Sequence, residues 1–113
     1  MSNEEKNSVE LELYEMGLPG QLVGKEVVDS LARKVGVVRS VKIRFFPLHV
    51  MVIIKGMGVE FSVNGTDIEA ISKTIVKLNK PAKQANEIEI DDVYRLRDEI
   101  YAEMKTIFAK IRT

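Results

Sequence analysis

The sequence predicts a mainly β domain that carries an amphipathic helix at its C-terminus. Up to about residue 79, short segments rich in β-branched residues alternate with turns that contain Gly, Pro or Asn. Beyond residue 90 the apolar residues recur at steps of three and four instead of two. Five to six short antiparallel strands without a long helix among them are typical of a small barrel or sandwich closed on itself. The 113 residues suffice for one such domain and an appendage.

The amino-acid composition excludes some classes of function and argues against others. The 17 Lys and Arg residues balance the 17 Asp and Glu residues, so the chain lacks the basic excess expected of a nucleic-acid-binding protein. The absence of cysteine excludes disulfides, thiolate catalysis and cysteine-ligated zinc. The longest apolar run, near Val50–Ile54, is far shorter than the ~20 residues that span a bilayer. We therefore expect a cytoplasmic protein that does not insert into the membrane.

The first half of the chain is expected to supply a strand and a hairpin. Residues 1–8 are polar and predicted to be a flexible N-terminus, and residues 9–13 alternate apolar and acidic side chains as a strand with one buried face does. That strand could pair within its own chain or across a dimer. Residues 22–28 and 35–45 form two strand candidates, and Asp29 in the intervening turn can satisfy backbone N–H groups with its side chain. Pro47 should bend the chain before the next strand.

The second half is expected to complete the barrel over residues 9–79. Residues 49–55 and 59–63 read as strands, Asn64-Gly65 as a turn, and residues 66–71 as a single helical turn capped by Thr66 or Asp67. Residues 74–78 read as the last strand. The polar residues 80–90, with Pro81, are predicted to be a linker to a C-terminal helix over residues 91–113.

The segments "LVGKEVVDSLARKVGVVRSVKI" (22–43) and "VNGTDIEAISKTIVKL" (63–78) resemble the PRC-barrel domain. That domain occurs in the photosynthetic reaction-centre H subunit, in the C-terminal half of the RNA-processing factor RimM and in small stand-alone archaeal proteins. The resemblance covers residues 22 to 79 and is most like the archaeal cell-division proteins that associate with SepF, the membrane adaptor of FtsZ. It implies a non-enzymatic adaptor whose partner is SepF or a PRC-barrel paralogue, recruited to the division site. The alternative that the resemblance leaves open is an accessory of RNA metabolism or ribosome maturation, similar to the barrel half of RimM.

The helix offers the main candidate interaction surface. Its apolar arc spans roughly 160°, wider than the stripe that a one-sided surface helix buries. Aromatic residues along one edge of that arc are typical anchors of protein interfaces. We therefore expect the helix to contribute to a homodimer or to partner binding, the alternative being that it only covers its own barrel. The predicted interface consists of Val93, Tyr94, Leu96, Arg97, Ile100, Tyr101, Met104, Ile107, Phe108 and Ile111.

Other residues offer weak candidates for chemistry. His49 is the single histidine and has no second imidazole or thiol to complete a metal site or a catalytic pair. Lys55–Gly58 lacks the Lys-Ser/Thr of a phosphate-binding loop, and Asp91-Asp92 lacks the ligand spacing of a calcium loop. The lysines between residues 73 and 83 are not interleaved with aromatics for base stacking. We accordingly predict no catalytic site, no cofactor, no metal and no enzymatic activity.

Overall fold

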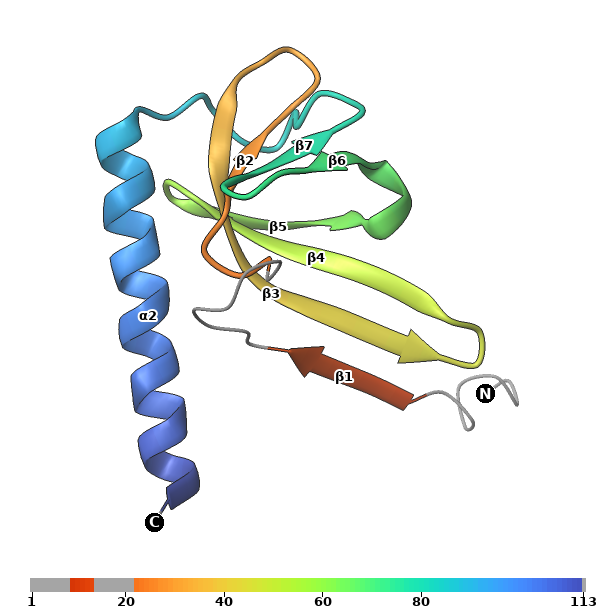
Figure 1. The fold of residues 1–113 in the computed structure, drawn as a ribbon, viewed down its shortest axis with the longest axis vertical. Coiled ribbons are helices and arrows are strands. Elements are labelled where there is room, and N and C mark those ends of the chain that lie inside the picture. The colour runs from red at the N-terminus through yellow and green to blue at the C-terminus, as the bar shows by residue number, and fades with distance from the viewer. Residues whose placement is uncertain (1–8, 14–21, 113) are drawn as a thin grey trace.

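The computed structural model describes residues 9–13 and 22–112, which form seven strands, a 3₁₀ helix and one long α-helix (Figure 1). The predicted flexible N-terminus, residues 1–8, lies outside the described residues. The elements in chain order are β1 (Val9–Leu13), β2 (Glu26–Val28), β3 (Lys34–Phe45), β4 (His49–Gly56), β5 (Val59–Asn64), η1 (Gly65–Asp67), β6 (Ile68–Ile71), β7 (Ile75–Leu78) and α2 (Ile90–Arg112).

The long strand β3 organises the sheet. The strand order is β5-β4-β3-β2-β7-β6, and β1 also pairs with β3. Along one edge, β3 pairs with β4 over most of its length, whereas β2 and β1 share the other edge in succession. Val37 is thus opposite Glu26 of β2, and Val41 is opposite Leu13 of β1. The N-terminal strand therefore pairs within its own chain.

The mainly β class and the C-terminal helix are confirmed, but the expected strand arrangement needs correction. The structure has seven strands rather than five or six, and β2 pairs with β7 in parallel, so the sheet is mixed rather than antiparallel. Among the described residues, no pairing of the terminal strands β5 and β6 closes the sheet into a barrel. Two neighbouring parallel strands must be joined by a long crossover connection. The connection between β2 and β7 contains four other strands, and local sequence patterns do not reveal so distant a pairing.

The segment predicted as a helical turn is another correction. Only Gly65–Asp67 is helical, as a 3₁₀ turn that Asn64 precedes, and residues 68–71 continue as strand β6. Ile68 is already extended, with φ −89° and ψ 119°. In β6, Ile68 pairs with Leu78 and Ile71 pairs with Val76 of β7. The backbone N–H and C=O groups of residues 68–71 therefore find their partners in the sheet instead of in a helix.

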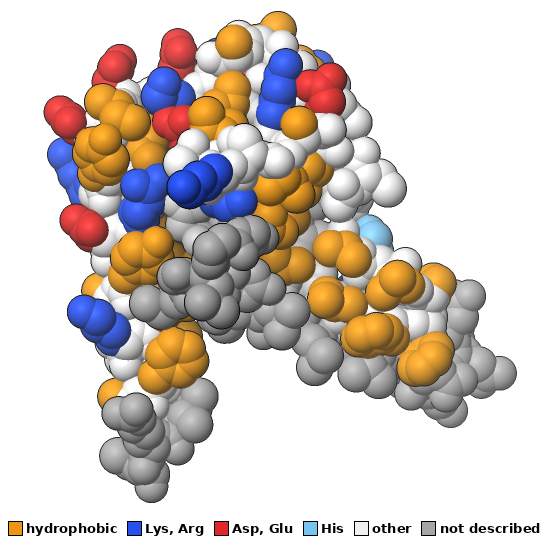
Figure 2. Space-filling model, in the orientation of Figure 1, with side chains coloured by type: hydrophobic (Ala, Val, Ile, Leu, Met, Phe, Trp, Pro, Cys, Tyr) orange, Lys and Arg blue, Asp and Glu red, His pale blue; other side chains and the backbone are white. Residues whose placement is uncertain are grey.

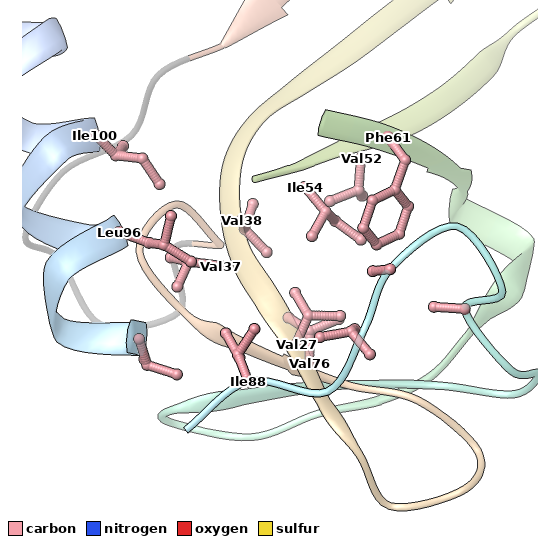
Figure 3. Close-up of a cluster of buried hydrophobic side chains, with 14 of the residues drawn as sticks. Val27, Val37, Val38, Val52, Ile54, Phe61, Val76, Ile88, Leu96 and Ile100 are labelled. Atoms are coloured by element: carbon pink, nitrogen blue, oxygen red, sulfur yellow. The ribbon is translucent and has the colours of Figure 1, made fainter. Parts of the chain in front are cut away.

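Both faces of β3 are buried, and this fixes the place of α2. Val37 and Val38 are each completely inaccessible to solvent although they are consecutive. In Figure 3, Val37 points toward Leu96 of α2, whereas Val38 points toward Ile54 and the interior of the curled sheet. Because successive strand residues face opposite sides, the apolar pair requires a layer on each side of β3. The helix supplies one layer and the sheet itself the other.

The connection between β7 and α2 also belongs to the core. Its sequence is polar, yet Ala82, Ala85 and Ile88 are 3%, 5% and 5% exposed and lie in the same cluster as the sheet and helix side chains. The amide of Ile88 donates to the carbonyl of Lys34 at 2.8 Å. Residues 80–90, predicted as a linker, therefore hold the start of the helix against β3 rather than tether it loosely.

Asp29 joins this connection to the β2–β3 turn. Its buried carboxylate accepts hydrogen bonds from the backbone amides of Leu31, Arg33 and Ala82, at 3.0 to 3.1 Å, and pairs with the Arg33 guanidinium at 2.6 Å. Burial acts to raise the pKa of Asp29, but the Arg33 guanidinium and these three amides outweigh it and lower that pKa. One side chain thus fixes the turn and anchors the segment that leads into α2.

We expect Asp29→Ala to lower the free energy of unfolding by ~2–4 kcal/mol, because it leaves buried donors without an acceptor. Since the folded-state pKa is depressed, this contribution is complete above the unfolded-state pKa and is lost as the pH falls through the folded-state value. Urea denaturation of the wild-type protein and of Asp29→Ala, at pH 7 and at successive values below pH 4, measures the difference in their free energies of unfolding. A stability difference that is independent of pH would contradict the assigned role of the carboxylate.

Candidate interaction surface

The predicted interface residues of α2 divide into two groups. Four of them form the helix stripe, in which each side chain is at most 2% exposed: Val93, Leu96, Ile100 and Met104. The stripe packs into the core cluster against the sheet, and Figure 3 shows Leu96 and Ile100 pointing from α2 toward β3. Spacing of three and four residues places all four on one face of the helix. The stripe therefore covers the chain's own sheet, the alternative that the sequence left open.

The second group forms the aromatic edge, which we define as Tyr94, Arg97, Tyr101 and Phe108. Tyr94 is 54% exposed and Phe108 is 45% exposed, whereas Arg97 and Tyr101 are half-buried. Ile107 is also half-buried, but its spacing of three from Met104 places it in line with the stripe. Ile111 also lies in α2, but its side chain is outside the described part of the structure. The edge runs along the helix beside the stripe, so two exposed rings remain on a surface that the sheet does not cover.

Arg97 and Tyr101 tie the aromatic edge to the loop before β2. The Nε of Arg97 donates to the carbonyl of Gly24 at 2.7 Å, and its guanidinium lies 5.9 Å from the centre of the Tyr94 ring. Gly24 has φ +91°, and a Cβ built there would lie 2.5 Å from the Tyr101 hydroxyl oxygen. Only glycine fits both the backbone conformation and this close approach. The exposed Tyr94 is thus held by a well-anchored neighbour.

An ion-pair network fastens the other side of α2 to the sheet. The Lys55 ammonium of β4 lies 2.9 Å from Glu103 and 3.3 Å from Glu99, both on the helix. Glu103 also pairs with Arg39 of β3 at 3.1 Å, and Arg39 pairs in turn with Glu60 of β5. Arg39 sits at the irregularity in the β3–β4 register, between Val38 and Ser40. Arg39 is therefore the extra residue of a β-bulge, without a partner in the β3–β4 register, and its guanidinium reaches Glu103 of the helix.

The charges of this network stabilise one another. The hydrogen bond from the Lys55 ammonium, with Arg39 nearby, outweighs burial and lowers the pKa of Glu103. Burial acts to lower the pKa of Lys55, but the carboxylates of Glu103 and Glu99 outweigh it and raise that pKa. Both groups therefore stay charged near neutral pH. The helix is held by the apolar stripe and by these ion pairs on its flank.

The weak chemical candidates have structural partners. Nε2 of His49 lies 2.9 Å from Oδ1 of Asn64 on the neighbouring strand. Lys55, first residue of the glycine-containing turn, is engaged with the helix, and Asp92 accepts the amide of Glu89 at 3.0 Å before α2. Within residues 9–13 and 22–112, no group of three or more His, Cys, Asp or Glu side chains could hold a metal ion.

Two of the four clustered lysines are paired. The Lys77 ammonium lies 3.2 Å from Glu69, and the Lys80 ammonium lies 3.1 Å from Asp67. Lys80 and Asp67 also line a pocket of about 270 Å³ between η1, β7 and the following connection. Its lining side chains are mainly polar, and the ion pair across it occupies the charged groups. Neither Cys nor His is among the described residues that line this pocket.

Sequence reasoning missed the exposed apolar residues of the β3–β4 hairpin. Figure 2 shows hydrophobic side chains gathered over this hairpin at the lower right, away from the charged surface at the upper left. Phe46 and Leu48, which flank Pro47, are 66% and 68% exposed. The signal was present in the sequence "FFPL", because a turn seldom carries three large apolar side chains. Pro47 itself predicts only a bend at this position.

We expect Ile100→Ala to lower the free energy of unfolding by ~2–5 kcal/mol, because it opens a cavity in the shared core of helix and sheet. Phe108→Ala, on the aromatic edge, should change it by less than ~1 kcal/mol. Chemical denaturation of the two variants checks this contrast. Equal losses at the two positions would show that the stripe and the edge have been wrongly separated.

Comparison with family models, with curated proteins and with solved structures found no match to this chain. Within the described residues, no helix has both the length and the apolar character needed to cross a bilayer. Function must therefore be inferred from the burial, contacts and charges of the side chains set out above.

Proposed function

We propose that the chain is a non-enzymatic adaptor that associates with itself and binds partner proteins, one of them through the aromatic edge of α2. The observation that carries this proposal is the exposure of Tyr94 and Phe108, 54% and 45%, on a helix whose adjacent face is occupied by the core. Exposed aromatic side chains beside a half-buried arginine match the residue types that dominate binding energy at protein interfaces.

The attachment of α2 supports a binding role for its edge. The helix stripe, the Lys55–Glu103 ion pair and the Arg97–Gly24 hydrogen bond fix the helix from three sides. A partner that docks on the edge therefore does not have to order the helix first. Preorganisation of this kind reduces the entropy lost on association. A mixed surface of two rings and one guanidinium fits a partner that offers an apolar groove with acidic groups at its rim.

The resemblance to PRC-barrel proteins supplies the most specific partner. We propose that the aromatic edge binds SepF or a PRC-barrel paralogue in archaeal FtsZ-based cell division, and that this brings the protein to the division site. The proposal uses the residues 22–43 and 63–78 that carry the resemblance together with the exposed edge. It needs neither a cofactor nor a reaction.

The test is biolayer interferometry of the full chain against purified SepF and against a PRC-barrel paralogue. Replacing Tyr94 and Phe108 together by alanine should weaken binding at least ~10-fold, because each ring is expected to contribute more than ~1 kcal/mol. Thr106→Ala, an exposed change on a different face of α2 from Tyr94 and Phe108, serves as the matched control and should leave binding unchanged.

Two results would contradict the proposal. Absence of binding to either protein at ~100 µM, with both shown to be active, would remove the division partners. Binding that the double variant does not weaken would remove the aromatic edge as the contact surface.

A further inference from the structure

The outer half of the β3–β4 hairpin, with β1 alongside, forms what we call the arm: β1, residues 41–45 of β3 and residues 49–52 of β4. Figure 1 shows it extending away from α2 and from the curled part of the sheet. The β3–β4 register pairs Val41 with Val52 and Ile43 with Val50. Residues directly opposite in an antiparallel pair share a face. These apolar pairs therefore continue one face of the sheet out of the core and along the arm.

The opposite face of the arm carries the charges. Lys42 is the partner of Met51 and Arg44 that of His49 in the β3–β4 ladder, one residue out of step with the apolar pairs. On the other side of β3, the ladder places Glu12 opposite Lys42 and Glu10 opposite Arg44. The arm is thus an amphipathic sheet in which the described charged side chains are confined to one side.

The apolar face is open to solvent at its outer end. Ile43, Phe45 and Val50 are half-buried, and the tip residues Phe46 and Leu48 are 66% and 68% exposed. The rings of Phe45 and Phe46 are 6.4 Å apart with a tilt of 50°. Figure 2 shows several hydrophobic side chains, and no charged one among the coloured atoms, over the hairpin at the lower right. An exposed apolar group of this kind on a sheet is a recurrent sign of an interaction site.

We propose that a second copy of this chain packs on the apolar face of the arm, face to face about a two-fold axis. The described side chains of the face carry no charge, so an identical face is complementary to it and no ionised group loses its water. Sheets that pack in this way lie ~10 Å apart with interdigitated side chains. The inference rests on the proposal that the chain self-associates, but it moves the contact from α2, whose stripe is occupied, to the arm.

The dimensions of the arm set the expected affinity. Five paired residues at ~3.4 Å per residue and three strands ~4.8 Å apart give a footprint of roughly 17 by 14 Å. This is smaller than the ~800 Å² that each partner buries in a typical stable complex. We therefore expect a reversible dimer with a dissociation constant in the micromolar range. The zero net charge of the chain gives it no electrostatic attraction to anionic lipid, which favours a second copy over a membrane surface.

Neighbouring residues of β4 offer a matched pair of variants. Val50 and Met51 are both half-buried, but Val50 belongs to the apolar face and Met51 to the charged one. A charge placed at each position therefore tests the two faces separately.

The experiment is sedimentation velocity of the full chain from ~1 to ~200 µM, a range that brackets the expected micromolar dissociation constant. The measured mass of the wild-type protein should double as its concentration rises through this range. Val50→Glu should weaken dimerisation at least ~100-fold, because each copy then brings an unpaired carboxylate to the contact. Met51→Glu should leave dimerisation within ~3-fold of wild type, because its carboxylate stays in water.

The possible outcomes distinguish a dimer formed through the arm from a monomeric chain and from an arm that binds a lipid surface. Should Val50→Glu fail to fold, as judged by circular dichroism, Leu48→Glu at the exposed tip replaces it and is likewise expected to yield monomers. A wild-type chain that is monomeric throughout, or equal losses in Val50→Glu and Met51→Glu, would overturn the inference. So would co-sedimentation of the monomer with phosphatidylglycerol vesicles that Val50→Glu abolishes. Because Val50→Glu leaves the aromatic edge intact, its binding to SepF tests the adaptor function separately.

Discussion

The burial of β3 on both faces is the constraint on which the rest of the structure depends. Val37 and Val38 are consecutive and completely inaccessible, so one layer of side chains must cover each side of the strand. The curled sheet provides Ile54 and Val76 on one side, and α2 provides Leu96 and its neighbours on the other. The close approach at Gly36, where a Cβ would lie 2.5 Å from the carbonyl oxygen of Lys55, lets β4 pair tightly with this strand. Removing the helix would expose the side of the central strand on which Val37 lies.

The surfaces open to other molecules follow from this arrangement. Since the stripe of α2 faces β3, the helix offers a partner only side chains outside the stripe, and its exposed aromatic rings, Tyr94 and Phe108, belong to the aromatic edge. The arm arises in the same way, because β3 is longer than the sheet segment that the helix covers and continues as a sheet with one apolar face. The two surfaces lie on different elements. A self-contact on the arm and a partner contact on the helix are therefore compatible in one adaptor.

Local patterns in the sequence predicted most of the elements, and tertiary pairing decided the remainder. The period of three and four in residues 93–104 predicted the helix because one face of it is buried, and Asp29 was expected in a turn because its side chain can accept backbone amides. The parallel pairing of β2 with β7 depends on contacts almost fifty residues apart, which no local pattern encodes. Periodicity likewise showed that the α2 face would be covered but not by which surface. Pro47 by itself predicts only a bend, and a bend does not show whether Phe46 and Leu48 beside it are buried or exposed.

The most direct test of this account is native-state hydrogen exchange measured residue by residue on the full chain. If the stripe makes α2 a structural layer of the domain, the amides from Leu96 to Met104 should exchange only in the global unfolding event, together with those of Val37 and Val38. Their opening free energies would then equal the free energy of unfolding from denaturation. Rapid exchange along α2 while β3 remains fully protected would show that the helix is a dispensable appendage, and would contradict the account.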